Sequence, residues 1–439
     1  MRILVLSNLY PPYYVGGYEL RCKQIIDALR RRGHDVFVLT SDYGVDTPGA
    51  VEVEPDISRT LRLHGFFGRP WLHVRQLQIL ETHNNDALRS AITSFRPDVV
   101  HVWNLGGISK SILHTLERLN LPTTFDVSDH WIARSQKADV WLDWWNRKQG
   151  PAAARALRSV FEGVGLRRHW DSMAPTTPLH SDSFKRLYFC SGALRRLTAA
   201  AGYDVEHGAI IHCAVDTQRF SGEPISAFKP LRRLLYVGRL SEDKGALTAL
   251  CALATVKELF TGELHIYGKG DAYYTEKLHT YVKEHQLPVS FHHATQDEMP
   301  KVYPRHDALL FTSEWEEPFA LTPLEAMASG LPVIGTTTGG SAELFRHGKN
   351  ALTYQAGDAT ELAQRLLELN SSGMLRHNLA VKGQKDVVQR CSEPVIVSQI
   401  ENYLRETIAC WSLISPSARN HSAARRTIRS HASATHLAH

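Results

Sequence analysis

The chain of 439 residues lacks several features that would place it in a membrane, secreted or metal-binding class. Its longest apolar run, from Ala246 to Val256, is too short to cross a bilayer. No secretory pattern stands at its start, so we expect no leader peptide. The six cysteines include no Cys-x-x-Cys pair and lie in apolar segments, which favours buried free thiols over disulfides or zinc ligands. We therefore predict a cytoplasmic protein.

Metal-binding and dinucleotide-binding patterns are also missing. The 23 histidines include the neighbours His292 and His293, but no acidic or thiolate partner stands at a ligand spacing, so we predict no metal site. The segment from Pro11 to Gly17 is rich in glycine but does not read Gly-x-Gly-x-x-Gly, which argues against NAD binding. Its adjacent Gly16 and Gly17 still allow a phosphate to approach the backbone closely.

Positive charge is concentrated in two segments, although the formal net charge of the whole chain is only +5. Residues 151–170 carry four arginines against one glutamate, and residues 413–439 carry four arginines and no acidic residue. These two segments hold an excess of seven positive charges, so the remainder of the chain is slightly acidic. No basic face for nucleic acid is predicted.

The length, together with 43% hydrophobic residues, predicts two domains. Short apolar strands alternate with amphipathic helices in the first half, and the pattern restarts at Leu234, which predicts two doubly wound parallel sheets. We place an N-terminal domain at residues 1–217, a linker at 218–232 and a C-terminal domain at 233–393. Ligands of such sheets bind beyond the carboxyl ends of the strands, so a cleft between the domains is the expected site.

Two segments depart from this alternation. The sequence of residues 134–182 predicts a helical insertion. It contains a helix near Ala152 to Gly163, and around this helix stand the four arginines of residues 151–170 and four tryptophans: Trp141, Trp144, Trp145 and Trp170. Such a segment either docks peripherally on an anionic membrane, here at its inner face, or forms an ordinary helical flap with solvated arginines. The tail, residues 413–439, is rich in Ser, Ala, His and Arg and predicts disorder.

Two carboxylates eight residues apart, Glu317 and Glu325, flank a predicted strand-to-helix turn. The apolar run from Asp307 to Ser313 predicts a buried strand before the turn. Thr322 is suited to begin the next helix as its N-cap and Gly330 to end it, so free backbone N–H groups would face the turn and attract a phosphate. Alternatively, Thr322 and Glu325 form a capping box, in which Glu325 only ties down its own helix.

The whole string from Phe311 to Gly340, FTSEWEEPFALTPLEAMASGLPVIGTTTGG, resembles the signature of glycosyltransferase family 4, whose members are retaining enzymes of the GT-B fold. The resemblance implies that Glu317 lies near the transferred sugar and Glu325 at the nucleotide ribose. It also implies backbone amides facing the sugar and diphosphate, from Phe319, Ala320 and Leu321. The segment reads Glu-Pro-Phe-Ala where the family usually has Glu-Gly-Phe-Gly, and losing both glycines narrows the donor's approach to the backbone.

A second resemblance concerns the phosphate groups. The segment from Val237 to Gly245 is similar to the Gly-Arg-x4-Lys-Gly segment of the family, which implies that Arg239 and Lys244 clamp the diphosphate. No Asp-x-Asp metal motif occurs in the chain, so we expect these cations to act without a metal ion. Further donor-binding positions are assigned by the same likeness: Gly16 and Gly17 at the distal phosphate, Gly268 at a strand end, and His293 where the family holds the base.

The acceptor side is less clear from the sequence. The stretch from Asp126 to Trp131 resembles a His-Asp-x-Trp stretch of the family and places Ser128 where the family has histidine. Ser128 cannot titrate near neutrality. Either Asp129 or His130 therefore assists the reaction, or the leaving phosphate itself takes the acceptor proton.

These resemblances extend over about residues 2–400 and imply a GT-B fold, with two Rossmann-like domains facing a cleft and a final helix at residues 394–412 that crosses back onto the N-terminal domain. The implied activity is a retaining hexosyltransferase that needs no cofactor or metal. It would move a sugar from a nucleoside diphosphate donor, UDP or GDP, to a glycan, lipid-linked or small-molecule acceptor. A nucleotide-sugar epimerase or hydrolase, or a non-catalytic nucleotide-sugar-binding subunit, stays as an alternative.

Overall fold

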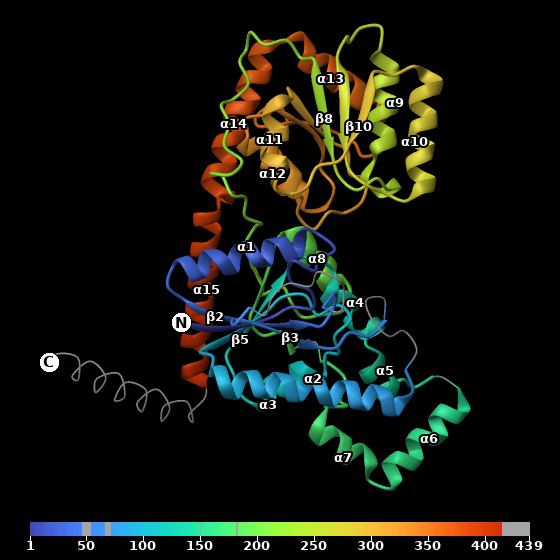
Figure 1. Cartoon of the computed structure of the whole chain (residues 1–439), viewed down its shortest axis with the longest axis vertical. Helices are drawn as coiled ribbons and strands as arrows, with labels where there is room; N and C mark the ends of the chain where they lie inside the picture. The colour runs from blue at the N-terminus through green and yellow to red at the C-terminus, as the bar shows by residue number, and fades with distance from the viewer. Residues whose placement is uncertain (46–53, 66–71, 150, 181–182, 415–439) are drawn as a thin grey trace, which may run out of the picture.

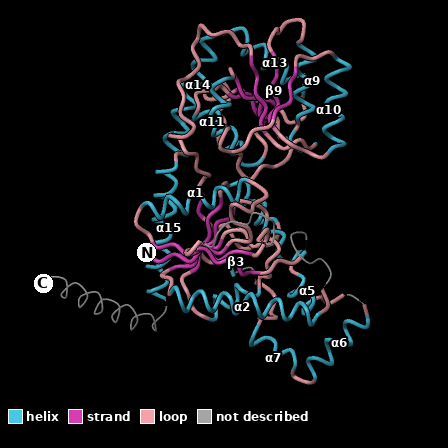
Figure 2. The backbone as a smooth tube through the Cα atoms, viewed as in Figure 1, coloured by secondary structure: helices cyan, strands magenta, loops and turns pink. Residues whose placement is uncertain are grey.

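Two parallel β-sheets, one in each half of the chain, organise the computed structural model (Figure 1), which describes residues 1–45, 54–65, 72–149, 151–180 and 183–414. The backbone trace shows the strands of each half gathered at its centre with helices around them (Figure 2). The predicted α/β fold of two doubly wound parallel-sheet domains is therefore confirmed.

In the N-terminal half the described strands form a seven-stranded sheet in the order β3-β2-β1-β4-β5-β6-β7, with every neighbouring pair parallel. Ile3 to Leu6 of β1 are all fully buried, as expected for a parallel strand covered on both faces. The order reverses between β1 and β4, which creates a topological switch point there. The strands are β1 (Arg2–Leu6), β2 (Asp35–Ser41), β3 (Ile57–Leu61), β4 (Val99–Val102), β5 (Thr123–Val127), β6 (Leu187–Phe189) and β7 (Ala209–Ile210).

Helices cover both faces of this sheet, with α1 on the side of the C-terminal half and α2 and α3 on the opposite side (Figure 1). Four helices, α4 to α7, occupy the segment between β5 and β6, and Trp141 and Trp145 are buried there in a cluster of aromatic rings. The helices are α1 (Gly17–Arg31), α2 (Val74–Phe95), α3 (Ser111–Arg118), α4 (Trp131–Ala138), α5 (Val140–Asn146), α6 (Ala152–Gly163), α7 (Leu166–Met173) and α8 (Gly192–Ala200).

The C-terminal half repeats the same winding in a six-stranded parallel sheet of order β10-β9-β8-β11-β12-β13. Its strands are β8 (Arg233–Val237), β9 (Glu263–Tyr267), β10 (Val289–His292), β11 (Ala308–Phe311), β12 (Val333–Thr336) and β13 (Leu352–Tyr354). Its helices are η3 (Glu242–Lys244), α9 (Ala246–Val256), α10 (Ala272–His285), α11 (Met299–Val302), η4 (Tyr303–Arg305), α12 (Leu321–Ala328), η5 (Gly339–Glu343), α13 (Ala359–Ser371) and α14 (Gly373–Cys391).

The last helix, α15 (Glu393–Ile414), leaves the C-terminal half and packs against α1 of the N-terminal half (Figure 1). Its Ile396, Ile400 and Leu404 are fully buried in one core cluster with Ile25 and Leu29 of α1. The predicted tail begins inside this helix, and its residues 415–439 lie outside the described residues.

Two further expectations concern the surface. Cys22, Cys190, Cys213 and Cys391 are buried, whereas Cys410 is exposed, so the prediction of buried thiols is wrong at that position on α15. Within the described ranges, no helix combines the length and apolarity needed to cross a bilayer.

Candidate active site

The loops that follow the strands of the two sheets meet each other, so the carboxyl edges of both sheets border one site. The C-terminal contribution is the loop between β11 and α12. Its Trp315 ring lies 5.8 Å from the ring of His130, which follows β5, and its Phe319 ring stacks at 4.7 Å on His212, which follows β7. Ligands of parallel α/β sheets bind at such edges, which makes this junction the candidate site.

Lys244 and Glu317 are in direct contact at the centre of this edge. The Lys244 Nζ donates a hydrogen bond to Glu317 Oε1, which also accepts one from the Ser313 hydroxyl at 2.8 Å. The two side chains are only 19% and 11% exposed, so this ion pair is screened from water far more than an ordinary surface pair. The structure thus brings together the two residues to which the sequence assigned the diphosphate and the sugar.

The backbone explains why Lys244 reaches this position. Gly245, which ends η3, has φ +66, and a Cβ there would lie 2.0 Å from the Thr312 carbonyl oxygen. Only glycine therefore lets the η3 turn lie against the end of β11. The Thr312 hydroxyl donates to the Lys244 carbonyl at 2.9 Å, which fixes the two loops together.

A pair of glycines supports Glu317 from the other side, and the sequence reasoning gave it no role. The Gly340 N–H donates to the Glu317 carbonyl at 2.7 Å. A Cβ at Gly339 would lie 2.3 Å from that same oxygen, and one at Gly340 would lie 2.1 Å from the Pro318 oxygen. Two adjacent glycines after a predicted strand were the available signal, since they permit close backbone approach.

The helix that follows the loop begins two residues earlier than predicted. Its first residue is Leu321 and its N-cap is Ala320, so Thr322 is not the N-cap and makes no capping box with Glu325. Gly330, with φ +78, does follow the end of the helix as expected. The first N–H groups of α12 have no partner within the helix and point toward the loop that holds Glu317.

Glu325 is buried and bonded to a different segment. Its carboxylate accepts hydrogen bonds from the Tyr303 hydroxyl at 2.6 Å and from the Gln296 side chain at 3.1 Å. Burial raises the pKa of Glu325, and these two hydrogen bonds oppose the shift. Glu325 therefore ties α12 to the loop after β10, in which the sequence placed the nucleotide base.

The remaining donor-side residues are held less tightly. The Arg239 side chain is 65% exposed and lies 3.5 Å from Asp243, so it does not join Lys244 and Glu317. Gly268 lies against Gly238, whose oxygen would be 1.9 Å from a Cβ at that position, so this glycine lets the β8 and β9 loops pack together. His293 is exposed just after β10.

Gly16 and Gly17 stand at the start of α1, where the N-terminal half meets the C-terminal half. A Cβ at Gly17 would lie 3.0 Å from the Leu321 side chain, so the N-termini of α1 and α12 lie next to each other. The Gly16 N–H, however, donates to the Glu19 carboxylate at 2.9 Å. The Glu19 carboxylate therefore already accepts the amide hydrogen that the sequence analysis assigned to a phosphate.

The acceptor-side loop after β5 is anchored by a buried ion pair. Arg21 of α1 lies 2.6 Å from Asp126 and also donates to the Ser128 hydroxyl at 2.9 Å. Asp129 is free of this pair. It accepts hydrogen bonds from the Asn104 side chain at 2.9 Å and from the Trp131 N–H at 2.8 Å.

The two predicted acid–base candidates differ in protonation. Burial raises the pKa of Asp129 to about 6, which places its titration close to neutrality. Burial, followed by the charge of Arg134, lowers the pKa of His130, which is therefore neutral at pH 7. Of the two, Asp129 is the group that carries a charge at pH 7 and could accept a proton at slightly lower cost than an ordinary aspartate.

In the described part of the chain, no group of three or more His, Cys, Asp or Glu side chains is arranged to hold a metal ion.

Two parallel-sheet domains, with Lys244, Glu317 and the N-terminus of α12 where their loops meet, have the arrangement expected of a GT-B glycosyltransferase, and sequence comparisons support this class. The model described as "Glycosyltransferase Family 4" matches residues 15–219, and "Glycosyl transferases group 1" matches residues 223–386. The chain is 26% identical over 393 residues to a glycogen synthase of Mycobacterium tuberculosis, which covers 83% of this chain and 84% of that protein. The chain belongs to the family 4 glycosyltransferases.

Two further comparisons are with a curated relative and with a solved structure. A GDP-mannose-dependent alpha-mannosyltransferase of Mycobacterium tuberculosis is 26% identical over 365 residues, or 82% of this chain and 85% of that one. The crystal structure of HepE from Anabaena, in complex with UDP and glucose, has a TM-score of 0.63 at 19% identity and covers 92% of this chain and 100% of that one. At this identity the structural likeness shows the fold.

Replacing Lys244 or Glu317 by alanine is expected to lower the transfer rate by about 100-fold or more, because each removes a charged group from the centre of the cleft. The fold should persist, since both side chains lie at the edge of the sheet. Release of nucleoside diphosphate measures the rate, and circular dichroism checks the fold. Lys277→Ala is the matched control, because it removes an exposed 3.4 Å contact with Glu242 in the same half. Near-normal rates in K244A or E317A would remove that residue from the site.

Replacing Asp129 by asparagine is expected to change the pH dependence of stability. An aspartate with a raised pKa binds its proton more tightly in the folded state, so the free energy of unfolding falls as pH rises from about 4 to about 6. D129N should therefore melt at a higher temperature than the wild type at pH 7, and the two should agree near pH 4. If Asp129 also takes the acceptor proton, the wild-type rate should fall below about pH 6 and D129N should be slow at every pH.

Thermal melts across this pH range check the effect of D129N on stability, and initial rates separately check whether Asp129 takes the acceptor proton. Equal melting temperatures of D129N and the wild type, at pH 7 as well as at pH 4, would contradict the raised pKa of Asp129. A wild-type rate in D129N would leave the acceptor proton to the leaving phosphate.

Proposed function

We propose that the protein transfers a hexose from a UDP or GDP sugar, with retention of configuration and without a metal ion. The observation that supports this most is the contact of Lys244 with Glu317 beside the N-terminus of α12. In the proposed step the bond from the anomeric carbon to the diphosphate breaks, and the acceptor oxygen bonds to that carbon on the same face. The acceptor proton passes to the leaving diphosphate or to Asp129.

Each group has a defined part in this step. Lys244 and the first N–H groups of α12 stabilise negative charge on the leaving diphosphate, which replaces the usual task of a metal ion. Glu317 bonds the sugar hydroxyls and orients the ring. Asp129, across the cleft, lies on the acceptor side. Arg239 is mobile enough to turn from Asp243 onto the diphosphate, because its side chain is largely in water.

The donor is expected to raise the melting temperature, because it binds the folded state alone. At 100 times its dissociation constant a ligand adds about 2.7 kcal/mol, which is a shift of a few degrees for a chain of this size. A thermal-shift series with UDP, GDP, ADP and their glucose or mannose conjugates, each with and without EDTA, identifies the base and tests the metal. No shift with any of them would count against the proposal.

Product analysis separates transfer from the alternatives. A nucleotide-sugar hydrolase or epimerase releases or converts the sugar without an acceptor, whereas a transferase needs one. A non-catalytic subunit would bind the donor but show no turnover with any acceptor.

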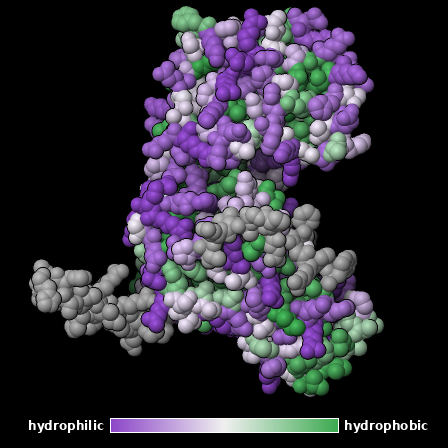
Figure 3. Space-filling view, in the orientation of Figure 1, coloured by the Kyte–Doolittle hydropathy of each residue, from purple (hydrophilic) through white to green (hydrophobic). Residues whose placement is uncertain are grey.

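We also propose that the protein docks on an anionic membrane through α6, on the cytoplasmic side where its free cysteines stay reduced. Neither α6 nor α7 has a buried residue, and both project from the body of the N-terminal half (Figure 1). Leu157, Val160 and Val164 are 41%, 57% and 71% exposed. Their spacing puts them on one face of the helix, and apolar surface gathers at this corner of the molecule (Figure 3).

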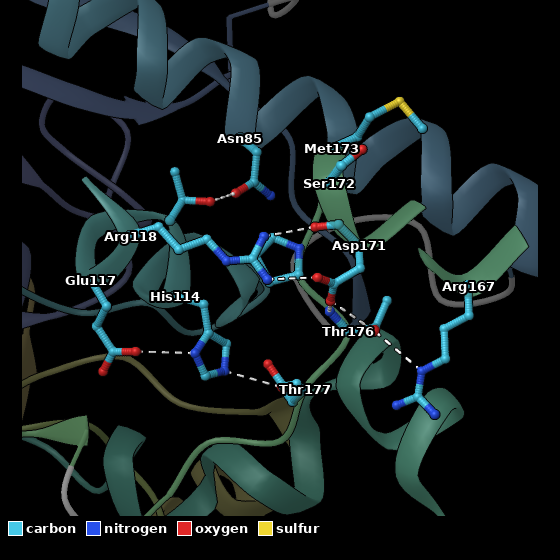
Figure 4. A network of polar contacts seen from close by, with 12 residues as sticks. Asn85, His114, Glu117, Arg118, Arg167, Asp171, Ser172, Met173, Thr176 and Thr177 are labelled. Carbon is cyan, nitrogen blue, oxygen red and sulfur yellow. Dashed lines mark hydrogen bonds and ion pairs between the residues drawn. The ribbon is translucent and has the colours of Figure 1, made fainter. Parts of the chain in front are cut away.

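The neighbouring helix holds that face rigidly outward. Asp171 of α7 accepts hydrogen bonds from Arg118 of α3 at 2.6 Å and from the Thr176 N–H at 2.8 Å (Figure 4). Arg167 of α7 in turn lies 2.5 Å from Glu162 of α6. The hairpin is therefore fastened to the sheet domain and presents its apolar face without first having to fold.

Charge favours an anionic surface. Arg168 is exposed in the first turn of α7, directly after the turn at Val164 and Gly165, and has no hydrogen bond or ion pair among the described residues. Each basic residue near an anionic surface contributes about 1 kcal/mol of attraction. Three partly exposed apolar side chains and one or two arginines predict weak, reversible and salt-sensitive binding.

The double substitution of Leu157 and Val160 by serine is expected to abolish sedimentation with vesicles of phosphatidylcholine and phosphatidylglycerol, because it removes the apolar face. Vesicles of phosphatidylcholine alone should bind the wild type far less. Leu259→Ser is the control, since Leu259 is 68% exposed on the C-terminal half. Wild-type protein that stays in the supernatant with both vesicle types would contradict membrane docking. It would favour the alternative, an ordinary helical flap with solvated arginines.

A further inference from the structure

The indole of Trp315 has an unused hydrogen-bond donor inside the candidate site. Its Nε1 atom is buried and has no hydrogen-bond partner among the described residues. The indole nitrogen can only donate, so no rearrangement of its own hydrogen satisfies it. Buried polar groups are nearly always paired, and this one, unlike that of Trp145, lies beside a lysine that can bind an anionic ligand.

The position of the ring connects this donor to the groups that handle the sugar nucleotide. The Lys244 Nζ lies 5.0 Å from the centre of the Trp315 ring, at cation–π distance, and the Trp315 carbonyl accepts the Glu317 N–H at 2.8 Å. Trp315 thus adjoins both members of the central ion pair. A ligand oxygen bound by Lys244 or Glu317 would therefore lie near this indole.

The N-terminal half also contacts the ring. The His130 ring lies 5.8 Å from the Trp315 ring, tilted by 56°. Burial lowers the pKa of His130, so a neutral imidazole packs there and adds no positive charge beside Lys244. The indole is consequently fixed by residues of both domains, which limits the positions its N–H can take.

We infer that Trp315 binds the nucleotide-sugar donor through its indole N–H, to an oxygen of the diphosphate beside Lys244 or of the sugar beside Glu317. This assignment rests on the proposed function. It makes Trp315 a donor-binding residue that no motif resemblance had singled out, and it gives the contact with His130 a purpose, which is to hold the indole in place when the two halves meet.

The test compares Trp315→Phe with the wild type by calorimetric titration with UDP, UDP-glucose, GDP and GDP-mannose. Phenylalanine keeps an aromatic ring over Lys244 and removes only the N–H. We expect about tenfold or greater loss of affinity, as for one hydrogen bond to an oxygen of a charged ligand. Loss for the nucleotide and its sugar alike places the acceptor on the diphosphate, and loss for the sugar nucleotide alone places it on the sugar. Trp315→His, which retains a ring N–H, should recover part of the affinity.

Trp145→Phe is the matched control, because Trp145 also has a buried indole nitrogen without a partner, but in the aromatic cluster of α5, away from the cleft. It should bind all four ligands as the wild type does. Equal affinity in W315F and the wild type would overturn this assignment and leave the proposed function standing. A wild type that binds none of the four ligands would overturn both.

Discussion

The contact between Lys244 and Glu317 is the interaction on which the rest of the site depends. It joins the loop after β8 to the loop after β11, and both loops reach it only because glycine backbones pack against them. Gly245 lets the lysine turn lie on the end of β11, and Gly339 and Gly340 support the glutamate from behind. A Cβ at any of the three would overlap a carbonyl oxygen, so the side-chain geometry is fixed by backbone contacts.

The same loop organises the meeting of the two halves. Phe319 stacks on His212, Trp315 meets His130, and Leu321 lies against Gly17. One further contact comes from η5, where Glu343 accepts the Ala193 N–H at 3.0 Å at the start of α8. A carboxylate at a helix N-terminus is favourable both as a hydrogen-bond acceptor and through the helix dipole. Ring stacking and this cap therefore connect the two halves at the site, in addition to the apolar packing of α15 on α1.

The sequence was sufficient for the fold because burial leaves a strong periodic signal. Continuous apolar runs such as Asp307 to Ser313 predicted buried strands, and the restart at Leu234 predicted the second sheet. Short edge strands escaped notice. β7 has two residues and β13 has three, which is too few for a period to emerge. The predicted start of α12 was wrong because its N-cap, Ala320, has no side-chain capping group. Thr322 has a hydroxyl of the kind that usually caps a helix, but it lies inside α12.

For the site, sequence reasoning chose the correct loops but could not choose the partners. The contact of Lys244 with Glu317 spans 73 positions, and the bonds of Glu325 to Tyr303 and Gln296 depend on how the loop after β10 folds back. Trp315 was hidden for a related reason. An indole in an acidic loop reads as an ordinary surface aromatic until the structure shows that its nitrogen is buried and that a histidine of the other domain lies against it.

The number of N–H groups on each hydrogen-bond donor of the site decides whether it can also bind the proposed diphosphate. The Lys244 ammonium has three N–H groups, so it can bond Glu317 and a phosphate oxygen at once, and the glutamate then still faces the sugar. The Gly16 amide has one N–H, which the Glu19 carboxylate already accepts at 2.9 Å. A phosphate at that position would have to displace a carboxylate and meet its negative charge. In the proposed function the diphosphate contact therefore falls on Lys244 and the N-terminus of α12, whereas Gly16, as the N-cap of α1, bonds Glu19 of its own helix.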